Sequence, residues 1–116
     1  MSILVFVEQR GGRIRSVSNE ALGLASRLKG ALGGEVVAIL PCASDPGAGS
    51  LGAAGADKVR LAAHPGLGSY DPAGYTRAVV AAAEELEPAL ILFPASSLGK
   101  DLAPRVAARL GVGLAS

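Results

Sequence analysis

Aromatic residues are scarce in this chain of 116 residues, which has two Tyr, two Phe and no Trp. Because half of the residues are hydrophobic, a core can still form, but it must be built from Ala, Val, Leu and Ile. An excess of charge is also lacking, since eleven basic residues oppose ten acidic ones and the formal net charge is +1. This near-balance argues against a nucleic-acid-binding protein, in which basic residues are in excess and clustered.

Cysteine and histidine occur once each, as Cys42 and His64. A single cysteine cannot form an internal disulfide, so the chain is compatible with a reducing cytosol. One His and one distant Cys are too few ligands for a metal site, and no nucleophile-elbow pattern accompanies His64. We therefore expect His64 in a surface loop, Cys42 as a small buried or partly buried residue, no bound metal and no enzymatic activity.

Long apolar runs are missing too, because none approaches the roughly 18 residues that a membrane-spanning helix requires. The first apolar run, residues 3–7, is too short for a signal peptide and has no basic segment before it. We expect a cytoplasmic protein with no membrane insertion. Asn and Gln occur once each, which fits a heat-adapted source, although a GC-rich genome produces a similar bias.

Four apolar runs alternate with helical patterns, an order typical of βαβ units. The runs predict strands at residues 3–7, 36–40, 58–62 and 89–93, and the patterns between and after them predict helices at 18–32, 51–54, 72–86 and 101–110. The third strand alternates charged and apolar residues and therefore belongs at an edge of the sheet. The predicted fold is a three-layer, doubly wound parallel α/β sheet with strand order 3-2-1-4-5, whose fifth strand, residues 112–116, is cut short.

Local signals place the ends and faces of these elements. Glycines within residues 10–13 predict a tight turn of a short hairpin, and residues 41–50 read as a loop. Ser18 is the expected N-cap of the first helix, and Pro104 is expected in the first turn of the last one. The inward face of the first helix is predicted to contain Ala21, Leu24, Ala25, Leu28 and Leu32.

The predicted strand order reverses between the first and fourth strands, so a ligand crevice is expected at their carboxyl ends. The loop after the fourth strand supplies the candidate residues for an anion or a nucleotide phosphate, namely Ser96, Ser97, Gly99 and Lys100. The alternative is that Ser97 or Asp101 simply caps the following helix. The glycine spacing before Lys100 is not that of a P-loop.

A charged face is expected on the last helix, where Asp101, Arg105 and Arg109 follow one another at intervals of four. Asp101 and Arg105 predict a surface ion pair, and a charged surface for a partner protein is the alternative interpretation.

Several segments taken together resemble the N-terminal domain of the electron transfer flavoprotein alpha subunit. The resemblance covers essentially the whole chain, in order and at matching spacing. The segments that carry it are residues 3–8, 15–18, 20–22, 55–59, 92–97 and 99–110.

This resemblance implies a single, incomplete N-terminal domain spanning residues 1–116. In the family, FAD is bound by a C-terminal domain that has no counterpart here, so the chain is expected to hold no cofactor. No FAD-contacting residue can be carried over. The implied role is that of a scaffold that packs against a beta-type subunit and supports flavin-based electron transfer between dehydrogenases and the respiratory chain.

The wider fold group also contains adenine-nucleotide-binding stress proteins, and a free-standing domain of that type is the alternative function. In such a domain, the four candidate residues of the crevice would hold the phosphates of the bound nucleotide. A glycine-rich phosphate loop after the fourth strand would distinguish this function, and Gly99 is the only glycine in that loop. The cut-off fifth strand predicts an unpaired sheet edge, which favours homo-oligomers when the partner is absent.

Overall fold

A parallel sheet of four strands runs through the middle of the computed structural model, which describes residues 2–112. The strands are β1 (Ser2–Phe6), β4 (Glu35–Cys42), β5 (Lys58–Ala63) and β6 (Leu90–Leu92), and their order is β5-β4-β1-β6. This arrangement confirms the predicted α/β fold and the relative order of its first four long strands. Of the predicted fifth strand, Val112 belongs to no strand, and the remainder lies outside the described residues.

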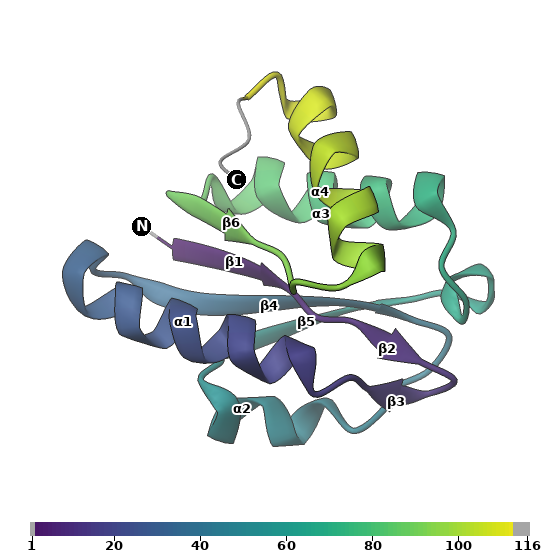
Figure 1. Cartoon of the computed structure of the whole chain (residues 1–116), viewed down its shortest axis with the longest axis horizontal. Helices are drawn as coiled ribbons and strands as arrows, with labels where there is room; N and C mark the ends of the chain where they lie inside the picture. The colour runs from purple at the N-terminus through teal and green to yellow at the C-terminus, as the bar shows by residue number, and fades with distance from the viewer. Residues whose placement is uncertain (1, 113–116) are drawn as a thin grey trace.

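Helices cover both faces of the sheet, as Figure 1 shows. One face carries α1 (Val17–Leu32) and α2 (Leu51–Ala54), and the other carries α3 (Pro72–Leu86) and α4 (Ser97–Leu110). A short hairpin, β2 (Gln9–Arg10) and β3 (Arg13–Ile14), extends from the end of β1, and the predicted turn joins its strands. Single 3₁₀ turns lie at Ala48–Ser50 and Pro65–Leu67. Within residues 2–112, no helix combines the length and the apolarity needed to cross a bilayer.

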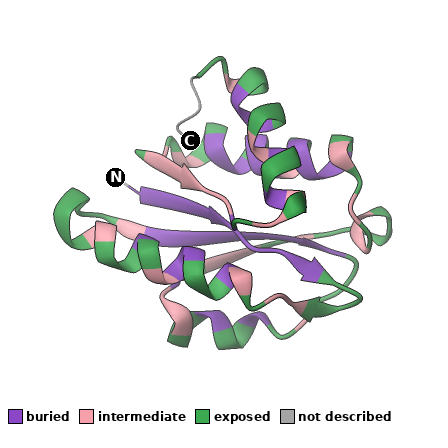
Figure 2. Ribbon diagram, viewed as in Figure 1, coloured by how far each residue is buried: buried purple, intermediate pink, exposed green. Residues whose placement is uncertain are grey.

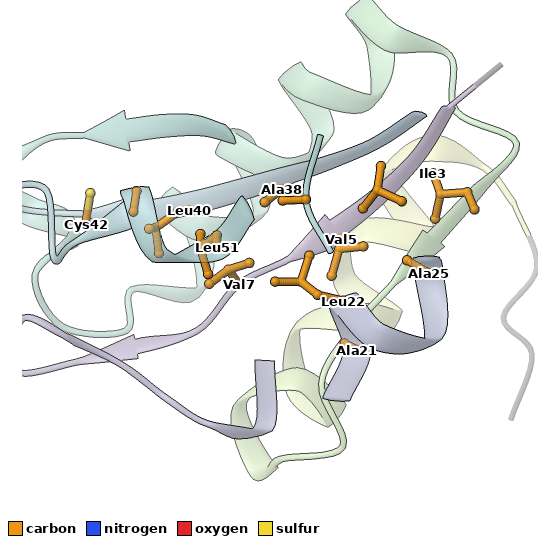
Figure 3. Close-up of a cluster of buried hydrophobic side chains, with 13 residues drawn as sticks. Ile3, Val5, Val7, Ala21, Leu22, Ala25, Ala38, Leu40, Cys42 and Leu51 are labelled. Carbon is orange, nitrogen blue, oxygen red and sulfur yellow. The ribbon is translucent and has the colours of Figure 1, made fainter. Parts of the chain in front are cut away.

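The core is split into two layers because successive residues of a strand face opposite sides of the sheet. Ile3, Val5 and Val7 face α1 and α2, where Ala21, Leu22 and Ala25 meet them (Figure 3). Leu4 and Phe6 face α3 and α4 and pack with Tyr75, Val79, Leu102 and Val106. The central strands β1 and β4 are almost wholly buried (Figure 2), which explains why their sequences are continuously apolar.

The first helix differs from its prediction in both its start and its inward face. Ser16, not Ser18, precedes α1, and Ser18 is a buried residue of its first turn. Leu24 and Leu32, predicted to face inward, are 41% and 44% exposed. Leu22 is fully buried in their place, because the helix is rotated so that this residue meets β1 and β4.

The second long strand continues further than predicted, since β4 includes Pro41 and Cys42, which were expected to open a loop. The carbonyl of Cys42 accepts a hydrogen bond from the His64 backbone N–H (2.9 Å), so Pro41 faces the opposite neighbour, β1. Pairing between β1 and β4 ends at Phe6 and Ile39. The last bond of this ladder runs from the Val7 N–H to the Ile39 carbonyl (2.9 Å), and Pro41 has no N–H with which to continue it.

The last strand and helix also correct the predictions. β6 is only three residues long and half-buried, not buried, because it is the last strand of the described sheet. α4 begins at Ser97, four residues before the predicted start at Asp101. Pro104 consequently lies inside this helix and not in its first turn, so the carbonyl four residues before it lacks the usual helical partner.

Candidate functional site

The crevice was predicted at the point where β1 and β6 end, and Ser96 lies at this point. Ser96 is the N-cap of α4, and its Oγ accepts a hydrogen bond from the Gly99 backbone N–H (3.0 Å). A serine does cap this helix, but the predicted caps, Ser97 and Asp101, were the wrong residues because α4 begins earlier than predicted. Ser97 is instead the first residue of the helix, and Asp101 lies one turn further along it.

A buried carboxylate fills the space beside this cap. Ser96 Oγ donates to Glu8 Oε1 (2.5 Å), and Arg15 Nη1 lies 3.1 Å from Glu8 Oε2. The Glu8 side chain is only 2% exposed. A buried carboxylate requires such partners because its desolvation is costly. Its two oxygens thus contact the starting turn of α4 and the arginine that follows β3.

The backbone of Glu8 is held as firmly as its side chain. Its N–H donates to Ser18 Oγ (2.8 Å), which in turn donates to the Glu8 carbonyl (3.4 Å). The Arg15 N–H donates to the same carbonyl (2.9 Å). Glu8 therefore joins the first turn of α1, the exit of the hairpin and the start of α4. Sequence reasoning missed this role, although an acidic residue directly after a fully apolar strand was a usable signal.

Gly99 is required by close packing. A Cβ atom placed on it would lie 2.1 Å from the Pro94 carbonyl oxygen and 3.3 Å from Ser96 Oγ. The loop thus turns back tightly on itself, without the open cradle of amides that a phosphate loop forms. Of the four candidates, Ser96 and Gly99 contribute to this compact turn, whereas Ser97 and Lys100 are exposed. All four lie at the start of α4, and their role as a phosphate site stays a prediction.

Gln9 connects the hairpin to the other side of the sheet. Its Nε2 donates to the carbonyls of Leu67 (3.2 Å) and Gly68 (3.1 Å) and to Tyr75 Oη (3.1 Å), and its Oε1 accepts from the Gly12 N–H (3.1 Å). Gln9 is buried. The hairpin is therefore fixed against the loop that precedes α3.

A second polar cluster fixes the same loop to α4. Tyr70 Oη donates to Asp101 Oδ2 (2.5 Å), and Arg105 Nε donates to the same oxygen (3.0 Å). The predicted ion pair of Asp101 and Arg105 is confirmed. Hydrogen bonds from Tyr70 and Arg105 lower the pKa of the Asp101 carboxyl, and burial together with the bond to Asp101 raises the pKa of Tyr70 to about 12.

Tyr70 is expected to make the folded state less stable in strong alkali. Its pKa is raised on folding from an ordinary value of 10.0 to about 12, so the folded state favours the neutral phenol. The stability it contributes is complete below pH 10 and is lost as the pH rises toward 12. Phenolate absorbance of a Tyr75→Phe variant, which leaves Tyr70 as the only tyrosine, measures this directly. In this background Asp101→Asn should lower the Tyr70 pKa, and titration near pH 10 before that change would contradict the prediction.

The remaining candidates for chemistry lie apart from the crevice. His64 is exposed, and its Nδ1 accepts from the Gly66 N–H (2.9 Å), which confirms its position in a surface loop. Cys42 is buried as predicted, and burial raises the pKa of its thiol. Within the described part of the chain, no three His, Cys, Asp or Glu side chains gather as a metal site would require.

Comparison with known proteins relates residues 3–116 to the electron transfer flavoprotein domain. Protein FixB of Clostridium saccharobutylicum is 38% identical over 112 residues, and the electron transfer flavoprotein subunit alpha of Megasphaera elsdenii is 40% identical over 114. The acryloyl-CoA reductase electron transfer subunit beta of Anaerotignum propionicum is 36% identical over 113 residues. Each match covers 97% of this chain but only 34%, 33% and 31% of the respective relative. The chain therefore spans about a third of the length of these relatives.

Proposed function

Because the chain belongs to the electron transfer flavoprotein domain family, we propose that it is a scaffold and partner-binding domain of an alpha-type subunit. In this role it is the incomplete N-terminal domain of a longer protein and catalyses no reaction itself. FAD is held elsewhere in that protein, and this domain packs against a beta-type subunit. The process it supports is flavin-based electron transfer between dehydrogenases and the respiratory chain.

The single observation that carries this proposal is the match over residues 3–116 to the family, together with relatives named as electron transfer flavoprotein alpha subunits. The geometry of the crevice agrees with a structural role. Its principal polar groups, Glu8, Ser96 and Arg15, satisfy one another. A site that acts on a substrate would instead present polar groups that converge on open space.

Partly exposed apolar surface supports the partner-binding half of the proposal. Parallel strands are normally covered on both faces, yet the three apolar residues of β6 all remain half-buried (Figure 2). Leu24 and Leu32 of α1 are exposed, and Leu28 beside them is only partly buried. Leu90 and Leu92 lie on the α1 side of the sheet, whereas Ile91 faces α3 and α4. Further protein packed over the α1 side would remove Leu90, Leu92 and the α1 leucines from water, at a gain of roughly 25 cal/mol per Å² of apolar surface.

Association with a beta-type subunit tests the proposal. The tagged chain is mixed with the electron transfer flavoprotein beta subunit of the same organism and analysed by size-exclusion chromatography with light scattering. We expect one complex containing a single copy of each chain. Leu24→Glu with Leu32→Glu should weaken this complex while leaving the circular dichroism of the domain unchanged. Separate elution of the two unmodified chains would contradict the proposal.

The same light-scattering run examines the chain alone. Without its partner it is expected to form homo-oligomers, because β6 offers an apolar strand at the end of the described sheet. Calorimetry with FAD is a separate test of the proposal. We expect no binding of FAD by this domain in isolation. Saturable binding of FAD would assign the flavin site to this chain and overturn the division of roles proposed here.

A further inference from the structure

The crevice at the carboxyl ends of β1 and β6 lies where this architecture ordinarily binds its ligands. In open parallel sheets, the point where the strand order reverses leaves a gap between two loops, and helix starts at that gap favour anions. Here the two loops are those that follow Val7 and Phe93. Whichever group fills this gap in the folded chain therefore decides which ligands the gap can bind.

The occupant is part of the chain itself. The Glu8 carboxylate bridges the gap by accepting hydrogen bonds from Ser96 at the start of α4 and from Arg15 on the other side. It pairs with Arg15, is almost wholly excluded from water, and lies 2.5 Å from the N-cap hydroxyl. A carboxylate in this position has the charge and the hydrogen-bonding capacity of an external oxyanion.

We infer that Glu8 is an internal anionic ligand of this crevice, which holds α4 and the hairpin exit together and closes the gap to phosphate-bearing ligands. A phosphate at the same place would lie against a buried carboxylate, and like charges at such distances repel strongly in a poorly solvated site. It would also compete for Ser96 Oγ, whose single proton is already donated to Glu8. Gly99, packed against Pro94, leaves no wider loop into which the phosphate could move.

Chemical rescue by a small carboxylate tests this inference. Glu8→Ala removes the internal ligand and leaves Ser96 and Arg15 without their acceptor, so its melting temperature should fall. Sodium formate, the probe, should then raise that melting temperature by about 3 °C or more above the value in sodium chloride of equal ionic strength. Wild type and Glu84→Ala, which removes an exposed glutamate, serve as controls and should respond equally to the two salts.

If Glu8→Ala is unfolded in chloride, formate should restore its helical circular dichroism. A variant that formate neither stabilises nor refolds would overturn the inference. In the unmodified chain, AMP should leave the amide NMR signals of Ser97, Gly99 and Lys100 unchanged. Saturable shifts of these signals would show an open site and overturn it as well. Neither result depends on the beta-type subunit, so this inference and the proposed function can fail separately.

Discussion

Gly99→Ala is expected to reduce the free energy of unfolding by about 3 kcal/mol or more. The new Cβ would lie 2.1 Å from the Pro94 carbonyl oxygen, a distance that no rotamer change can relieve because both atoms belong to backbone-fixed positions. Either the cap of α4 or the end of β6 must move. Since Ser96 bonds both Gly99 and Glu8, movement of the cap also disturbs the buried carboxylate.

Gly30→Ala is the matched control, because Gly30 is likewise a helical glycine but has nothing within 4 Å of its Cβ position. Alanine favours a helix over glycine, so this change should stabilise the protein by roughly 0.5–1 kcal/mol. Urea denaturation of both variants measures the difference. Equal stability changes at the two positions would show that the approach of Pro94 to Gly99 does not constrain the fold.

Tyr75→Ala is expected to cost about 3–5 kcal/mol. Tyr75 is among the largest fully buried side chains, and its ring centroid lies 6.1 Å from that of Phe6 and 5.1 Å from that of Tyr70. The loss would create a cavity between α3 and the sheet. It would also remove the hydroxyl that donates to Leu67 (2.9 Å) and accepts from Gln9.

Tyr75→Phe separates the hydroxyl from the ring. It keeps the packing and should cost only about 1–2 kcal/mol, the range for a lost buried hydrogen bond. Denaturation curves of the two variants give the comparison. A Tyr75→Phe variant as unstable as Tyr75→Ala would mean that the hydroxyl network, and not the aromatic packing, holds the loop before α3 in place.

The spacing of apolar residues predicted a strand or helix correctly wherever only one set of its faces could pack against the core. The central strands are covered on both faces, so residues 3–7 and 36–40 are continuously apolar and were placed to within two residues. β5 alternates because one edge and part of its surface meet water. Asp71 and Pro72 marked the start of α3 because these residues favour the first positions of a helix.

Local patterns failed where two signals competed. Ser16 and Ser18 both suit a helix start, and contact with the Glu8 backbone assigned Ser18 to the buried first turn. Ser96, Ser97 and Asp101 are likewise all good caps, and the packing of Gly99 against Pro94 selected Ser96. The face of α1 was similarly ambiguous, since Leu22 and Leu24 are equally apolar.

Patterns within short segments of the sequence were enough to predict the class of the fold, the order of its first four long strands and the family. The tertiary structure alone decided what lies in the crevice. Glu8 and Ser96 are 88 residues apart, and their 2.5 Å contact arises only when β1 and β6 pair side by side. Periodicity describes how a residue meets the core, whereas a contact between distant loops depends on the register of the whole sheet.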